Sequence, residues 1–242
     1  MARMREHTGA FSDATGRDLE QGGADQPRYR RYQHDLIAPH CGRTVLEVGA
    51  GLGEFATQFT GLDRLVLTDA DPDAVDLLAE RFADRPEVEA RQLALGGELS
   101  LDKPVDSVIA INVLEHIEDD AAALVSLATL VIPGGTIVLW VPGYQQLYGE
   151  FDRRVGHFRR YAPATLRDAF ERAGLRAELT KPVNLLGGIA WWAAVRRGGS
   201  TRPDPRLVTI YDRFVVPVTR AVESVLPVPF GQTVLGVARV PG

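Results

Sequence analysis

Residues 44–56 read TVLEVGAGLGEFA. The apolar run at the start of this stretch is typical of a strand that is buried on both faces of a sheet. Glycines then stand at the alternate positions 49, 51 and 53, where a backbone without Cβ atoms can turn sharply and approach a ligand closely. We expect a helix to follow from Glu54 to Thr60, so that the stretch forms the first strand, loop and helix of an α/β fold.

Outward from this stretch, short apolar runs alternate with amphipathic segments, which predicts a parallel sheet with helices on both faces. The predicted strands are residues 44–48, 64–68, 88–93, 107–111 and 136–141, and the predicted helices between them are 54–60, 72–82 and 120–131. Further helices are predicted at 27–37, 164–173 and 205–226, the last with a kink at Pro217. Residues 232–240, QTVLGVARV, are the candidate for a final strand.

The charges beside the glycines indicate the kind of ligand that the loop would hold. In the dinucleotide-binding fingerprint a third glycine stands five residues after the first, where this chain has Glu54. A pyrophosphate favours the positive end of a helix, and Glu54 would place a negative charge there. Glu47 adds a second carboxylate, so a cationic ligand is favoured over the phosphates of a nicotinamide dinucleotide. A tight turn that binds no ligand, and an NAD(P)-dependent oxidoreductase, remain the alternatives.

The second predicted strand ends in LVLTDADP, residues 65–72. An acidic side chain at the tip of this strand can accept hydrogen bonds from two ribose hydroxyls, and Asp69 holds that position. Asp71 precedes Pro72 and is expected to cap the next helix instead, with the proline in the first helical turn. The pair formed by the glycine loop and Asp69 therefore predicts a nucleoside site.

These two motifs, together with PVDSVIAINVLEHIEDD (104–120) and LVIPGGTIVLWVP (130–142), resemble class I S-adenosylmethionine-dependent methyltransferases. The likeness covers about residues 30–180. It implies a Rossmann-like, doubly wound α/β fold with a seven-stranded sheet, mostly parallel with an antiparallel last strand, which suits residues 232–240. It also implies transfer of a methyl group from S-adenosylmethionine to an oxygen, nitrogen or carbon of a small-molecule acceptor. A protein that binds this cofactor without transferring its methyl group is the competing interpretation.

The resemblance assigns cofactor contacts to four places in the chain. The loop would wrap the amino-acid moiety, Asp69 would hold the ribose, and Ala70 would lie against the adenine. Many relatives have an aspartate after the third strand, but this chain reads RQLALGG there, so backbone groups near Ala94 and Leu95 would replace it. The expected cofactor-binding residues are Glu47, Gly49, Ala50, Gly51, Gly53, Asp69, Ala70, Ala94, Leu95, Asn112 and Val113.

The segment GYQQLYGEFDRRVGHFRRYAP, residues 143–163, is expected on the acceptor side of the sheet. It looks like a subgroup of these methyltransferases that shares a D-x-x-x-G-H-x-R-R-Y signature, which begins here at Asp152. His157 is the expected general base, and His116 of the LEH pattern either serves as a base or packs locally. The expected acceptor contacts are Tyr144, Tyr148, Arg159, Arg160 and Tyr161, with the arginines suited to an anionic acceptor. The alternative is a structural clasp, in which Asp152 pairs with an arginine and Tyr161 packs.

Composition limits the remaining possibilities. The 242 residues carry a net charge of −5, which favours solubility and gives no reason to expect nucleic-acid binding. We expect a flexible tail at 1–26 and one methyltransferase domain at 27–242, with a lid around 142–161 and a helical cover around 185–226. Residues 185–195 are compatible with a core, an acceptor cover or a homodimer contact.

The amino terminus has no apolar stretch of the signal-peptide type, and the longest apolar run is too short to span a bilayer. The single cysteine, Cys41, fits a reducing compartment, so a cytoplasmic location is expected. The five histidines are scattered, and neither His34 with His40 nor any group of Cys and His has the spacing of metal ligands. The sequence therefore predicts no metal site.

Overall fold

The computed structural model describes residues 26–95, 100–196 and 205–242, and nearly all of the predicted tail at 1–26 lies outside these ranges. A seven-stranded sheet has the order β3-β2-β1-β4-β5-β7-β6. Strand β7 runs antiparallel to both of its neighbours, and the remaining pairs are parallel, which confirms the predicted fold class. The strands are β1 Thr44–Val48, β2 Arg64–Asp69, β3 Val88–Gln92, β4 Val105–Ile111, β5 Val131–Pro142, β6 Arg176–Val183 and β7 Thr233–Arg239.

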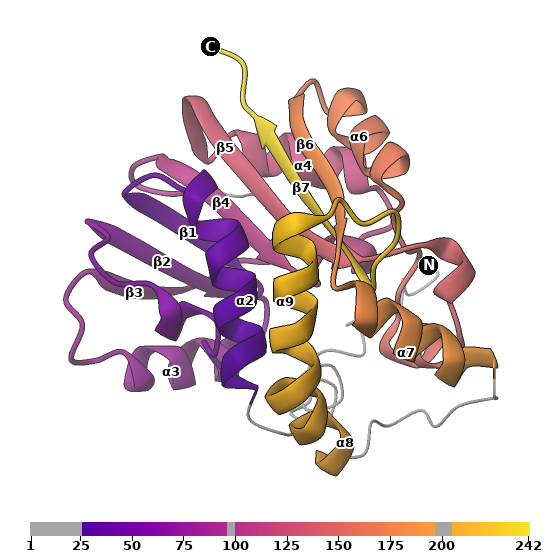
Figure 1. The fold of residues 1–242 in the computed structure, drawn as a ribbon. Helices are drawn as coiled ribbons and strands as arrows, with labels where there is room; N and C mark the ends of the chain where they lie inside the picture. The colour runs from indigo at the N-terminus through magenta and orange to yellow at the C-terminus, as the bar shows by residue number, and fades with distance from the viewer. Residues whose placement is uncertain (1–25, 96–99, 197–204) are drawn as a thin grey trace, which may run out of the picture.

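Helices cover both faces of the sheet, and each face has its own apolar core (Figure 1). Helices α2 (Pro27–Ile37), α3 (Pro72–Arg81) and α9 (Val216–Val225) pack on one face, where α2 and α9 lie side by side. Helices α4 (Asp120–Ala128) and α6 (Pro163–Arg172) pack on the other. The remaining helical segments are η1 Ala38–His40, η2 Ala56–Gln58, η3 Leu114–His116, η4 Gln145–Leu147, α5 Glu150–Val155, α7 Leu185–Arg196, α8 Pro205–Ile210 and η5 Tyr211–Val215.

The prediction of a helix at residues 54–60 is wrong. The chain forms turns there, with only the short 3-10 helix η2. The hydroxyl of Thr57 donates to the carbonyl oxygen of Glu54 at 2.7 Å and so competes with a helical backbone. Phe55 and Phe59 pack edge to face with a centroid distance of 5.5 Å, which holds the turn compact. The glycine loop is therefore not followed by the helix N-terminus that a pyrophosphate needs.

The helix predicted at 205–226 is present but contains a π-helical turn, η5, just before Pro217. Proline lacks an N–H and its ring crowds the carbonyl group four residues earlier, which here belongs to Arg213. That carbonyl oxygen accepts a hydrogen bond from Arg28 Nη1 at 2.8 Å instead. The π turn thus accommodates the proline without ending the helix, and it ties α9 to α2.

The outer side of α8, η5 and α9 carries a row of exposed apolar side chains. They are Leu207, Ile210, Phe214, Val218 and Val225, and the exposed Leu226 follows directly after α9. Isolated exposed apolar residues are ordinary, whereas a contiguous row on one helical side is typical of an interaction surface. None of the helices in the described ranges is both long enough and apolar enough to cross a bilayer.

Candidate cofactor and acceptor site

The glycine loop turns with positive φ angles at all three glycines. Gly49, Gly51 and Gly53 have φ angles of 69°, 55° and 72°, a region that residues with a Cβ rarely adopt. A Cβ atom on Gly49 would lie 2.6 Å from Cγ2 of Val113, and one on Gly53 would lie 2.6 Å from the ring of Phe82. The loop is therefore packed tightly between the end of β4 and helix α3.

Asp69 stands at the end of β2, beside the loop. Its two carboxylate oxygens accept hydrogen bonds from the backbone N–H groups of Gly51, at 2.9 Å, and Asp71, at 3.0 Å. A carboxylate has about four acceptor positions, so positions remain for ribose hydroxyls. Asp71 accepts from the N–H of Asp73 at 3.0 Å, which confirms its predicted role as the cap of α3.

Glu47 places a buried carboxyl group beside the loop. The side chain is only 3% exposed, and burial raises the pKa of its carboxyl group to about 8. Its Oε2 atom is buried and makes no hydrogen bond with any of the residues that the structure describes. A buried carboxyl oxygen without a partner is costly, and a hydrogen bond from a cationic donor at this position would stabilise the carboxylate.

Three residues other than glycine have positive φ angles in the described ranges, and all follow the carboxyl end of a strand. Asn112 (φ 53°) follows β4, Tyr144 (φ 60°) follows β5, and Asn184 (φ 63°) follows β6. Backbone strain of this kind clusters at ligand-binding sites. These three strands and β1 to β3 end at the same edge of the sheet, so the strained residues share that edge with the glycine loop.

The residues expected near the adenine lie at this edge as well. The N–H of Leu93 donates to the carbonyl oxygen of Asp69 at 2.9 Å, and Gln92 Nε2 donates to that of Ala70 at 3.0 Å. Ala70 and Ala94 are exposed, and Leu95 is half-buried. The ends of β2 and β3 thus bring these residues beside Asp69, with their backbone accessible to a flat ligand.

The segment after β5, residues 143–163, is held together by a buried network of charged side chains. Asp152 is fully buried and accepts from His157 Nδ1 and Arg160 Nε, both at 2.7 Å, and from the N–H of Gly149 at 2.9 Å. Burial by itself raises the pKa of Asp152. The hydrogen bond from His157 and the charge of Arg160 outweigh that effect, so its pKa lies below the usual range.

The five expected acceptor contacts all have partners within the protein. Arg160 is buried on Asp152, and the buried Tyr161 donates its hydroxyl to Asp120 at 3.1 Å. Arg159, which is partly exposed, lies 3.2 Å from the same Asp120 carboxylate. Tyr144 and Tyr148 donate their hydroxyl groups to backbone carbonyl oxygens, those of Pro229 and His157. For Arg160 and Tyr161, the geometry favours the structural clasp that the sequence left open.

Helix α7 lies against this segment. Trp191 donates its indole N–H to the carbonyl oxygen of Leu147 at 3.2 Å and packs edge to face on Phe151. The guanidinium of Arg160 lies 5.2 Å from the Trp191 ring, a cation–π contact. Of the two tryptophans in the apolar run, Trp191 therefore faces the predicted lid, while Trp192 is 44% exposed.

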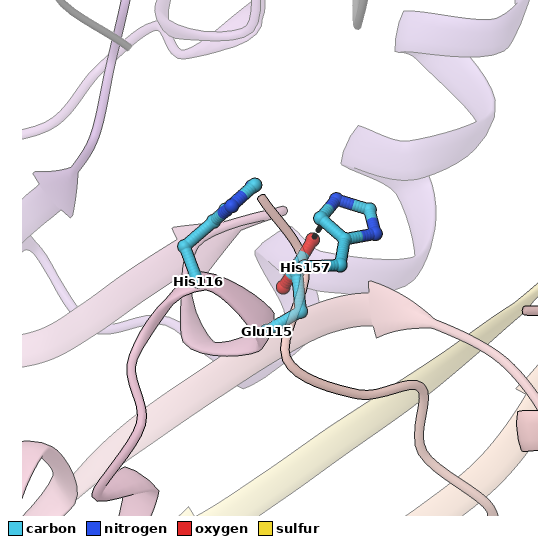
Figure 2. Close-up of side chains that lie close together, drawn as sticks. All are labelled: Glu115, His116 and His157. Carbon is cyan, nitrogen blue, oxygen red and sulfur yellow. Dashed lines mark ion pairs between the residues drawn. The ribbon is translucent and has the colours of Figure 1, made fainter. Parts of the chain in front are cut away.

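The structure brings together two histidines and a glutamate that the sequence did not connect. The rings of His116 and His157 are 4.5 Å apart, and Glu115 Oε1 lies 3.9 Å from His157 Nε2 (Figure 2). Glu115 is fully buried and was not predicted as a site residue, although the LEH pattern contains it. The sequence did not single out Glu115, because its partner His157 belongs to a distant segment of the chain.

A family model for a methyltransferase domain matches residues 21–180. The chain belongs to this family. A "probable S-adenosylmethionine-dependent methyltransferase" of Mycolicibacterium smegmatis is 32% identical over 179 residues, which are 71% of this chain and 68% of that protein. An "uncharacterized methyltransferase" of Mycobacterium bovis is 29% identical over 130 residues, 53% of this chain. The matched part spans about half the length of that relative, 51%.

Solved structures with the same fold include methyltransferases and a [4+2]-cyclase. The N-methyltransferase NodS of Bradyrhizobium japonicum, in complex with S-adenosyl-L-homocysteine, has a TM-score of 0.57 at 16% identity and covers 95% of this chain and all of its own. The [4+2]-cyclase SpnF has a TM-score of 0.59 at 15% identity, covering 88% of this chain and 80% of its own. At these identities the likeness establishes the fold alone.

Proposed function

We propose that this methyltransferase family member transfers the methyl group of S-adenosylmethionine to a small-molecule acceptor and releases S-adenosylhomocysteine. The observation that carries the proposal is the buried Glu47, whose Oε2 has no partner among the described residues and which lies beside the glycine loop. S-adenosylmethionine offers an ammonium and a sulfonium but no phosphate, so its charges match this carboxyl group. Asp69 at the end of the adjacent strand supplies the acceptor for a ribose, and the two groups together fit this cofactor.

The residues at the carboxyl ends of β1 to β4 divide the cofactor between them. The loop from Gly49 to Gly53, with Ala50 and Gly51, holds the amino-acid moiety, and Glu47 faces its ammonium. Asp69 holds the ribose, and the backbone at Ala70, Ala94 and Leu95 borders the adenine. Asn112 and Val113 border the methionine side. When bound, the cofactor supplies a methyl group on a good leaving group, so alignment is the main task left to the protein, and orientation can contribute about 7–11 kcal/mol.

We further propose that His157 and His116 act on the acceptor. His157 is held through Nδ1 by Asp152, so that its Nε2 faces Glu115 and His116. Tyr144, Tyr148 and the partly exposed Arg159 are proposed to line the acceptor's entry, which suits an anionic molecule. His157→Ala is expected to lower kcat by about 10²–10⁴-fold while the affinity for S-adenosylhomocysteine stays within about twofold. Single-turnover assays and calorimetry measure the two effects, and an unchanged kcat removes His157 from the mechanism.

Asp69→Ala tests the cofactor site directly. We expect S-adenosylhomocysteine to bind about 10–100-fold more weakly, because a hydrogen bond to a charged group contributes about 1.5–3 kcal/mol. Calorimetry of both proteins measures the change, and circular dichroism checks that Asp69→Ala remains folded. Asp73→Ala is the matched control, since Asp73 is an exposed carboxylate in the first turn of α3. Equal affinities of Asp69→Ala and the wild type, or no saturable binding by the wild type, would overturn the proposal.

The competing candidate, which the sequence leaves open, is a protein that binds this cofactor without transferring its methyl group. Incubation with a donor labelled in the methyl group and a library of acceptors separates the two. Label that moves to an acceptor supports methyl transfer. Cofactor binding without transfer to any acceptor favours the competing candidate. The dinucleotide alternative is disfavoured, because only the short 3-10 helix η2, and no α-helix, follows the glycine loop.

We propose that the protein forms a homodimer through the exposed apolar row on α8, η5 and α9. Desolvation of this row is the driving force, and Phe214, 60% exposed, lies near its middle. Phe214→Glu is expected to convert the dimer to a monomer while the affinity for S-adenosylhomocysteine is unchanged. Light scattering across a range of concentrations measures the mass, and a wild type that is monomeric throughout refutes the dimer.

We also propose a cytoplasmic location on the basis of Cys41. Cys41 is half-buried, and burial raises the pKa of its thiol to about 12, which favours a structural over a reactive role. As the one cysteine of the sequence, it has no partner within the chain for a disulfide bond. Both properties suit a reducing compartment.

A further inference from the structure

Glu115, His116 and His157 form a compact group of potential metal ligands at the acceptor side of the cofactor site. One ligand atom from each side chain lies within 4.8 Å of the others. Figure 2 shows the Glu115 carboxylate directed at the His157 ring, with His116 beside them. Glu115 and His116 belong to η3, directly after β4, and His157 comes from the segment after β5. Two strand ends thus bring three ligands of different segments to one point.

We propose that these three side chains bind a divalent transition-metal ion, of which Zn²⁺ is the model. Two imidazoles and one carboxylate are a ligand set for such ions, and they leave further coordination positions open. Bonds from the ion to nitrogen and oxygen are about 2.0–2.2 Å long, so ligands on one ion stand about 3–3.5 Å apart. The observed separations, 3.9 Å between Glu115 Oε1 and His157 Nε2 and within 4.8 Å for all three ligand atoms, exceed that spacing, so the side chains would have to move closer together on binding.

The surroundings of His157 support the same assignment. Its Nδ1 atom lies 2.7 Å from Asp152 Oδ1, which directs Nε2 toward Glu115. Metal-binding histidines regularly donate their second ring N–H to a carboxylate in this way, which fixes the tautomer and the ring orientation. Asp152 is in turn held by Arg160 and Gly149. In this assignment the aspartate and the second arginine of the D-x-x-x-G-H-x-R-R-Y pattern, Asp152 and Arg160, orient the metal ligand His157.

The position of the group connects the ion to the acceptor. Val113, two residues before Glu115, meets the Cα of Gly49 so closely that a Cβ there would clash with it. An ion at this group would lie next to the methionine side of the proposed cofactor site. Its open positions suit an acceptor with a hydroxyl or carboxylate oxygen, and the ion would lower the pKa of a hydroxyl bound there. This inference rests on the proposed methyl transfer and makes His157 a ligand rather than the proton acceptor.

The test is equilibrium dialysis of the full, chelator-treated chain against Zn²⁺ and, separately, Co²⁺, with bound metal measured by mass spectrometry. We expect one ion per chain, and for Co²⁺ visible absorption bands that report nitrogen and oxygen ligands. His116→Ala is the first variant because His116 is the least buried of the three ligands, and it should weaken binding at least about 100-fold. His40→Ala is the matched control, since His40 lies in η1, outside the group, and its binding should equal that of the wild type.

Glu115→Gln extends the test to the carboxylate, and thermal unfolding establishes whether this variant is folded. If Glu115→Gln does not fold, the comparison of His116→Ala with the wild type decides whether the group binds an ion. Failure of the wild type to retain an ion overturns the proposal, and so does retention by His116→Ala with the same affinity and spectrum. Calorimetry with S-adenosylhomocysteine runs in parallel on the metal-free protein. If the protein binds S-adenosylhomocysteine but no metal ion, the metal site is rejected and the proposed methyl transfer stands. If it binds a metal ion but not S-adenosylhomocysteine, the proposed methyl transfer is rejected.

Discussion

Asp152→Ala is expected to lower the free energy of unfolding by about 3–5 kcal/mol. The reason is that Asp152 is fully buried and is the common acceptor of His157, Arg160 and the Gly149 N–H. Its removal leaves a buried guanidinium without its carboxylate. Urea denaturation at pH 7 measures the change.

The same network predicts a dependence on pH. The pKa of Asp152 is lower in the folded protein than its ordinary value, so its contribution to stability is present above the ordinary range of aspartate and is lost as the pH falls through the folded pKa. Glu150→Ala is the matched control, because Glu150 lies on the same helix and pairs with Arg153 in solvent. The control should unfold as the wild type does. A loss below about 1 kcal/mol for Asp152→Ala would show that the network contributes little.

The parts of the site that the sequence predicts well depend on local chemistry. Glycines at alternate positions after a buried strand predict a sharp turn, and all three have positive φ angles in the structure. Asp71 before Pro72 implies a helix cap, which forms. Each of these features depends on only a few neighbouring residues, so the amino-acid sequence is sufficient to predict it. The antiparallel last strand came from family resemblance instead, because strand order is not a local property.

The parts that the sequence did not predict depend on tertiary contacts. Strand β6 shows no clear alternation and contains Pro182, which an edge strand tolerates because one side of it needs no hydrogen-bond partner. Asn184 is buried and bonded to Gln232 and to the hydroxyl of Tyr211, groups far along the chain. Glu115 and His157 meet only after the sheet has formed. No spacing rule relates such residues, so only the folded chain shows them together.

Binding of S-adenosylhomocysteine at pH 7 is expected to release a proton, and its affinity should rise as the pH increases toward 8. Burial raises the pKa of Glu47 to about 8, so at pH 7 the free protein holds this group mainly neutral. A ligand ammonium beside it favours the carboxylate and expels the proton. Above pH 8 the group is already ionised, and this contribution to the pH dependence ends. Calorimetry in buffers with different enthalpies of ionisation counts the released protons.

Glu47→Gln should abolish both effects and weaken binding by about 10²-fold or more, since loss of one partner of a buried ion pair costs about 2–5 kcal/mol. The matched control is Glu54→Gln, because Glu54 borders the same loop but is paired with Arg30 and Arg81 and is partly exposed. This control should keep the proton release of the wild type. If Glu47→Gln still releases the proton, the titrating group lies elsewhere, and the buried carboxyl group does not recognise the ammonium.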